Sequence, residues 1–169
     1  MLSRRLVLSL ATAAALALPA AAQDRLSVVA TTGMIADAAR EVGGELVDVT
    51  ALMGPGVDPH AYRQTRSDIV ATAQADLVLW NGLYLEAQLE DFLLELGETR
   101  PVVAVAETIP GSQLIGSDDY EGRFDPHVWM NPNLWSRVVL AVRDAMIDLR
   151  PGDEATFTAN ADAHLGELA

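Results

Sequence analysis

The sequence predicts an α/β fold, a four-stranded parallel sheet with flanking helices. Short apolar runs rich in β-branched residues, typical of buried strands, occur at residues 26–30, 46–52, 77–80 and 102–105. Patterns with helical spacing separate these runs, and this alternation favours right-handed βαβ units. Helices must cover both faces of such a sheet. Its ligands bind beyond the carboxyl ends of the strands.

Capping and stop signals place the first two helices. The first follows residues 31–33 and stops at the glycine pair 43–44. The second begins at Thr65, whose spacing to Asp68 is that of a capping box, and runs to about Ala75. Both helices therefore connect one predicted strand to the next.

Three later helices complete the pattern. Apolar residues recur at helical spacing over residues 85–97, after an Asn-Gly break that ends the third strand. Asn131 and Pro132 suit the N-cap and first turn of a helix that stops at residues 150–152. A last helical segment begins near Asp153 and continues to the end of the sequence.

The amino-terminal segment has the features of a secretory signal peptide. Arg4 and Arg5 precede an apolar run at residues 6–18 and small residues that end at Ala22, so we expect cleavage before Gln23. The apolar run is too short to span a bilayer, and we expect a periplasmic protein whose mature chain does not insert into the membrane. The arginine pair leaves open whether export uses the general or the twin-arginine route.

Composition restricts the classes of function. Half of the residues are hydrophobic, enough for one sizeable core in a mature chain of 147 residues. Loss of the two leader arginines moves the net charge from −13 to about −15, which disfavours nucleic acid and anionic lipid as partners. Without cysteine, we expect no disulfide, thiolate ligand or lipid-anchored cysteine. Nucleophile-elbow, phosphate-loop and His-Glu-x-x-His motifs are missing, which predicts a protein that is not an enzyme.

The tripeptide Asp-Pro-His occurs twice, at residues 58–60 and 125–127, and holds two of the three histidines. Proline fixes its own φ angle and pushes the preceding residue into an extended conformation, so each histidine leaves a stiff loop in a restricted direction. His60 follows the second predicted strand and His127 the fourth, and both loops can reach one edge of the sheet. One such tripeptide is most simply a surface loop, but the repeat favours a metal site.

His60 and His127 are therefore the candidate metal ligands, because neutral imidazole suits zinc and other first-row divalent ions. Asp58 and Asp125 could orient the imidazoles or cap nearby backbone N–H groups, and both roles stay open. Two imidazoles supply half of a tetrahedral shell, so carboxylates or a partner must complete it.

Three further side chains could form the walls of this site, namely Tyr62, Arg63 and Trp129, although core packing is the simpler use of Trp129. His164 stands alone on the last helical segment and is left out of the site. A lone histidine there more often faces solvent or packs against its neighbours than binds a metal.

Three motifs carry a resemblance to a known family. They are GPGVDPHAY at residues 54–62, NGLYLE at residues 81–86 and DPHVW at residues 125–129. With them, essentially the whole mature chain is similar to the zinc/manganese solute-binding proteins of ABC importers, and most similar to the TroA-like group. In that family the histidines that match His60 and His127 are metal ligands from the amino-terminal lobe. A carboxyl-terminal lobe supplies two more ligands.

The resemblance implies a monomeric periplasmic receptor that captures Zn²⁺ or Mn²⁺ as its transported ligand and delivers it to a membrane permease. It assigns residues 23–152 to the amino-terminal α/β lobe and residues 153–169 to the start of the helix that joins the two lobes. We therefore expect a fragment without the second lobe. The loop at residues 107–124, which we expect to be mobile, is acidic without histidine, and this tilts mildly against a zinc specialist.

Two alternatives stay open. A zinc metallohydrolase would use the same two histidines to activate water, but it needs a third ligand and a general base that the sequence does not identify. A structural or adhesive module would need no metal at all.

Overall fold

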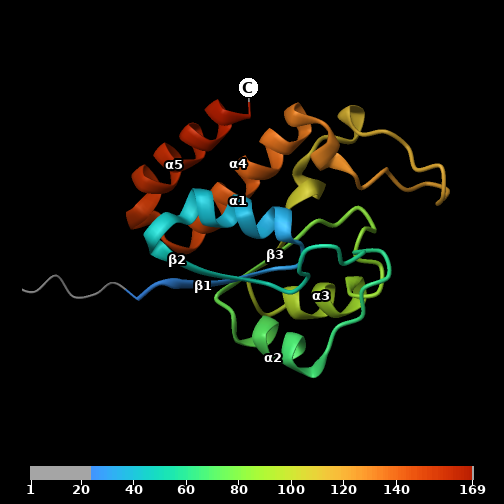
Figure 1. Ribbon diagram of the computed structural model, residues 1–169, viewed down its shortest axis with the longest axis horizontal. Helices are drawn as coiled ribbons and strands as arrows, with labels where there is room; N and C mark the ends of the chain where they lie inside the picture. Colours follow the sequence, from blue (N-terminus) through green and yellow to red (C-terminus); the bar gives the residue numbers. More distant parts are fainter. Residues whose placement is uncertain (1–23, 169) are drawn as a thin grey trace, which may run out of the picture.

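A computed structural model of the protein describes residues 24–168 and shows a sheet between two layers of helices (Figure 1). All four strands are parallel, in the order β2-β1-β3-β4. The strands are β1 (Leu26–Ala30), β2 (Val47–Ala51), β3 (Leu77–Trp80) and β4 (Val102–Ala104). The predicted fold class is therefore confirmed. The predicted signal peptide, residues 1–22, lies outside the described residues.

Helices cover both faces of the sheet, as a parallel sheet requires. Figure 1 shows α1, α4 and α5 on one face and α2 and α3 on the other. The helices are α1 (Gly33–Gly43), α2 (Arg66–Gln74), α3 (Glu90–Gly97), α4 (Pro132–Leu149) and α5 (Glu154–Glu167). Among residues 24–168, none of them is both long and apolar enough to cross a bilayer.

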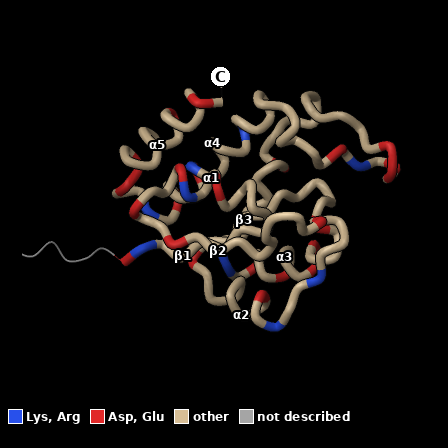
Figure 2. Tube along the Cα trace, viewed as in Figure 1, with Lys and Arg blue, Asp and Glu red and all other residues tan. Residues whose placement is uncertain are grey.

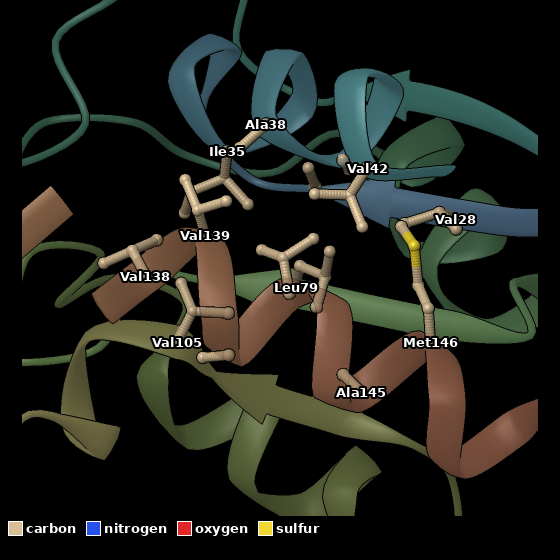
Figure 3. Packing of buried hydrophobic residues seen from close by; sticks show 14 of the residues in the cluster. Val28, Ile35, Ala38, Val42, Leu79, Val105, Val138, Val139, Ala145 and Met146 are labelled. Atoms are coloured by element: carbon tan, nitrogen blue, oxygen red, sulfur yellow. The ribbon is translucent and has the colours of Figure 1, made fainter. Parts of the chain in front are cut away.

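Alternate residues of the central strands enter different cores. Val28 and Leu79 belong to the larger cluster, and Figure 3 shows them packed among side chains of α1 and α4. Val29, Val78 and Trp80 belong to the smaller cluster, which α2 and α3 cover. This period of two explains why the strands are apolar throughout, since both of their faces are buried.

Side-chain caps confirm two of the predicted helix starts. The Thr65 hydroxyl accepts the backbone N–H of Asp68, and the Asp68 carboxylate accepts the N–H of Thr65, so the predicted capping box is present. The Asn131 side chain accepts a backbone N–H two residues on, and Pro132 is the first residue of α4. These caps fix the ends of the loops that follow β2 and β4.

The third helix starts later than predicted. The apolar spacing predicts a helix over residues 85–97, but α3 begins at Glu90. Leu83 and Tyr84 have positive φ angles, 54° and 67°, a left-handed conformation that cannot continue into a regular helix. Leu85 is fully buried in this turn, so its apolar character reflects packing of the turn and not one face of a helix.

The acidic loop between β4 and α4 contains more structure than its polar sequence predicts. The chain leaves β4 into a 3₁₀ turn at Val105–Thr108, one residue earlier than expected. Ile109 is buried in the larger core, and Gly116 and Phe124 form an antiparallel bridge that closes the rest of the loop. Its mobility stays a prediction.

Helix α5 shares the larger core with the sheet. Phe157 and Ala161 are fully buried in it, against α1 and α4. The side-chain amide of Asn160 donates to the carbonyl of Val42 near the end of α1, at 3.0 Å. Helix α5 therefore packs on the lobe that precedes it, and the domain boundary expected after residue 152 stays a prediction. That α5 leads into a second lobe stays a prediction.

Replacing Phe157 by alanine tests whether α5 stabilises the sheet layer. The side chain is fully buried, so we expect Phe157→Ala to lower the free energy of unfolding by about 3–5 kcal/mol. Thr156→Ala on the exposed side of the same helix is the control and should change it by less than about 0.5 kcal/mol. Urea unfolding measures both values. Equal stability of the two variants would show that α5 is not part of the cooperative core.

Candidate metal site

The structure brings the two predicted ligands together although 67 residues separate them. His60 follows β2 and His127 follows β4, and these are the two edge strands of the sheet. Their loops meet at the carboxyl edge, where the strand order reverses between β1 and β3. The two Nε2 atoms are 3.3 Å apart, and the ring centroids are 5.3 Å apart with the planes tilted by 47°.

The separation of the Nε2 atoms suits a shared metal ion. Bonds from zinc to imidazole nitrogen are about 2.0–2.1 Å long, so two such ligands on a tetrahedral centre lie about 3.4 Å apart. The observed distance of 3.3 Å agrees with this spacing. Without metal, the same distance allows one ring to donate an N–H to the other.

Asp125 holds the His127 ring in the orientation that a metal ligand needs. Its Oδ1 accepts the backbone N–H of His127 at 2.8 Å and is 2.6 Å from Nδ1 of the same residue. A proton on Nδ1 satisfies this contact and leaves the lone pair of Nε2 for a metal. The backbone N–H of His127 is the main cause that lowers the pKa of Asp125, with burial opposing it and the ring adding to it.

Asp58 occupies the same place in its tripeptide but has a narrower role. Its Oδ1 accepts the backbone N–H of His60 at 2.9 Å, which closes a tight turn. Among residues 24–168 its carboxylate forms no hydrogen bond to an imidazole ring. Of the two roles left open for these aspartates, Asp58 performs only the capping role, whereas Asp125 performs both.

Of the three predicted wall residues, Trp129 is the one beside a histidine. Its ring meets that of His127 edge to face, with centroids 5.1 Å apart. The Tyr62 hydroxyl instead donates to Asp68 at 2.7 Å, and burial followed by this bond raises the pKa of Tyr62 to about 12. Arg63 is exposed. Tyr62 therefore ties the His60 loop to the start of α2 and does not line the site.

No third ligand accompanies the histidine pair in the part of the chain that the structure describes. Residues 24–168 contain no group of three or more His, Asp or Glu side chains arranged to hold a metal ion. His164 lies on α5, partly buried, and takes no part in the pair. Two histidines alone would provide half of a tetrahedral shell, and a hydrolase would need further ligands and a base.

A cluster of aromatic and charged side chains borders the site. A pocket of about 120 Å³ lies between both histidines, Tyr84 and the acidic loop. The Arg123 guanidinium lies 4.4 Å from the ring centroid of Tyr84 and 3.6 Å from Glu90, and Tyr120 packs edge-on against Tyr84. Figure 2 shows the acidic residues gathered at the tip of this loop. The cluster fastens the loop next to the histidines.

Sequence reasoning assigned no role to Glu86, which is a buried anchor beneath the site. Its side chain is 1% exposed. Oε1 accepts the Thr31 hydroxyl at 2.6 Å and the Asn81 backbone N–H at 2.8 Å, and Oε2 accepts the Gly82 N–H at 3.2 Å. Burial raises the pKa of Glu86, and these hydrogen bonds oppose the shift. A glutamate in an apolar stretch just after a buried strand was the available signal.

Comparison with known proteins assigns the chain to a family. Residues 28–169 match the family model described as zinc-uptake complex component A, periplasmic. The chain belongs to this family. The resemblance inferred from the three motifs is thereby confirmed, and the zinc-uptake component A family also accounts for the parallel sheet and its covering helices.

Relatives in this family extend well beyond the matched region. The zinc-binding protein TroA of Treponema pallidum is 44% identical over 149 residues, which are 88% of this chain and 48% of that protein. The manganese-binding lipoprotein MntA of Bacillus subtilis is 43% identical over 148 residues, 87% of this chain and 48% of that protein. The chain therefore spans about half the length of the curated relatives it matches.

Solved structures show the same fold. The periplasmic zinc-binding protein TroA from Treponema pallidum superposes with a TM-score of 0.82 at 43% identity, covering 86% of this chain and 52% of that chain. A manganese-bound periplasmic metal-binding protein from Candidatus Liberibacter asiaticus superposes with a TM-score of 0.75 at 26% identity, covering 85% and 53%. Both proteins therefore share the fold of this lobe.

The raised pKa of Glu86 predicts a pH dependence of stability. In the folded chain it lies above the ordinary value of 4.5, so the folded state binds more protons than the unfolded state between the two pKa values. This contribution is present below the unfolded pKa and is lost as pH rises through the folded pKa. Glu86→Gln does not titrate. We expect the stability of the wild type relative to this variant, measured by urea unfolding, to fall as pH rises above the ordinary glutamate value of 4.5. A constant difference would contradict the shift.

Proposed function

We propose that this chain captures a divalent transition metal, Zn²⁺ or Mn²⁺, in the periplasm as cargo for the permease of an ABC importer. His60 and His127 bind the ion through Nε2. The observation that carries the proposal is the 3.3 Å separation of these two atoms, with Asp125 on the opposite nitrogen of His127. The function is capture and release, and it assigns no chemical step to the chain.

Relatives support the class of metal. TroA is named as zinc-binding, MntA as manganese-binding and YfeA of Yersinia pestis, 33% identical, as iron-binding. All three are first-row transition metals, which imidazole binds well. The signal-peptide features of residues 1–22 support export to the periplasm.

Exposed apolar side chains on the histidine loops favour a metal site whose remaining ligands come from another lobe or a partner. Five large apolar side chains on the two histidine loops are 38–76% exposed. They are Val57, Ile115, Tyr120, Phe124 and Met130. Of the five, Tyr120 and Phe124 line the pocket that both histidines border. Exposed apolar side chains beside polar groups are typical of a surface that a partner or another lobe covers. We propose that this covering surface supplies the remaining ligands, in line with the greater length of the relatives.

Substitution of each histidine tests the proposal. Two ligands alone hold zinc weakly, and removing either leaves one. We expect His60→Ala and His127→Ala each to weaken zinc binding by about 10-fold or more, measured by calorimetry with chelator competition. His164→Ala, the third histidine, is the matched control and should bind like the wild type. Unchanged affinity in both site variants would refute the assignment of the ligands.

The two aspartates give a second test, because their contacts differ. Asp125→Ala removes the hydrogen bond to Nδ1 of His127, and we expect zinc affinity to fall by about 10-fold. Asp58→Ala removes only a backbone contact and should cost clearly less. Calorimetry with chelator competition measures the zinc affinity of both variants. A larger loss in Asp58→Ala would show that the ring contact of Asp125 does not matter for binding.

A further inference from the structure

The buried carboxylate of Glu86 contacts the ends of the two central strands. Strands β1 and β3 pair as far as Ala30 and Leu79, and the N–H of Thr31 still bonds to the Leu79 carbonyl. Beyond that point the ladder ends. The N–H of Asn81 goes to Oε1 of Glu86, the same atom that accepts the Thr31 hydroxyl. Oε1 of Glu86 therefore takes the place of the next hydrogen bond between the two strands.

Thr31 connects Glu86 to the loop that carries His60. Its carbonyl accepts the N–H of Met53 at 3.0 Å, while its hydroxyl donates to Glu86 at 2.6 Å. Met53 is buried and opens the loop that leads to His60. Thr31 itself is fully buried. The start of the first histidine loop is thus joined to Glu86 through one residue.

Asn81 connects Glu86 to the segment that carries His127. Its backbone N–H donates to Oε1, and its side-chain amide donates to the carbonyl of Pro126 at 3.2 Å. Pro126 directly precedes His127, and both Asn81 and Pro126 are buried. His127 therefore directly follows a residue that Asn81 holds, whereas His60 lies seven residues beyond Met53.

We propose that Glu86 is a positioning residue for metal capture, which sets the spacing of His60 and His127 by fixing Thr31 and Asn81 on one carboxylate oxygen. Asn81 is the relay to His127. Short hydrogen bonds of 2.6 and 2.8 Å to Oε1 restrain Thr31 and Asn81, and each of these residues holds the loop that carries one histidine. The inference rests on the proposed function for its purpose, but the spacing that Glu86 sets can be measured without metal.

The metal-free test uses nuclear Overhauser contacts between the imidazole ring protons of His60 and His127, whose ring centroids are 5.3 Å apart. We expect the contact in the wild-type chain and its loss or strong weakening in Glu86→Ala and in Asn81→Ala. Glu86→Gln keeps an acceptor at the position of Oε1 and should retain the contact. Full retention in both alanine variants would overturn the inference, whether or not the chain binds zinc.

The metal-bound test is zinc affinity of the same variants. We expect a loss of about 10-fold in Glu86→Ala and Asn81→Ala, as for groups that orient ligands, and recovery to within about 3-fold of the wild type in Glu86→Gln. Phe157→Ala is the matched control, because it destabilises the fold from α5, which packs on α1 and α4, and it should keep wild-type affinity. Affinity that falls equally in Phe157→Ala would assign the effect to general destabilisation and overturn the inference.

The two proposals fail in different ways. If the histidine substitutions leave zinc affinity unchanged, the proposed function is wrong, while the ring contact still decides the role of Glu86. If Glu86→Ala does not fold, Asn81→Ala still tests the relay, because it removes the side-chain hydrogen bonds to the carbonyls of Pro126 and Gly82 and keeps the Asn81 backbone N–H. A ring contact and an affinity that both survive in Asn81→Ala would then refute the relay.

Discussion

A sheet with all strands parallel is the constraint on which the site depends. Parallel strands place all carboxyl ends at the same end of the sheet. In the order β2-β1-β3-β4, the two strands that precede the histidines, β2 and β4, are the two outer strands. Their loops must cross inward to meet above β1 and β3. The candidate metal site therefore lies above the two central strands, whose carboxyl ends are buried.

The same constraint explains why a carboxylate is buried at this point. Where the loops cross inward, the backbone N–H groups after β3 have no further strand to pair with, and buried N–H groups without partners are costly. Glu86 accepts two of them, from Asn81 and Gly82. The left-handed turn at Leu83 and Tyr84 is what brings this carboxylate back beneath the strand end. The left-handed backbone at Leu83 and Tyr84 and the buried carboxyl group of Glu86 therefore serve the same purpose, which is to pair the N–H groups at the end of β3.

Features that depend on local patterns could be predicted from the sequence. The strands follow from their apolar runs, and the starts of α2 and α4 follow from Thr65 and Asn131. The position of the site follows from the repeated Asp-Pro-His. The start of α3 could not be predicted, because leucines of the turn mimic helical spacing. Neither could the role of Glu86, because its burial arises from contacts with residues up to 55 positions away.

The repeated tripeptide predicts the backbone contact of each aspartate but not its contact with the imidazole ring. Both aspartates bind the backbone N–H of the histidine two residues later, as the proline geometry favours. Only Asp125 also reaches the ring. That difference has a thermodynamic consequence. The His127 ring is fixed by Asp125 and flanked by Trp129 before any ligand arrives, so binding removes little of its rotational freedom. In the proposed capture of a metal ion, the entropy cost of ordering the two ligands therefore falls mainly on His60.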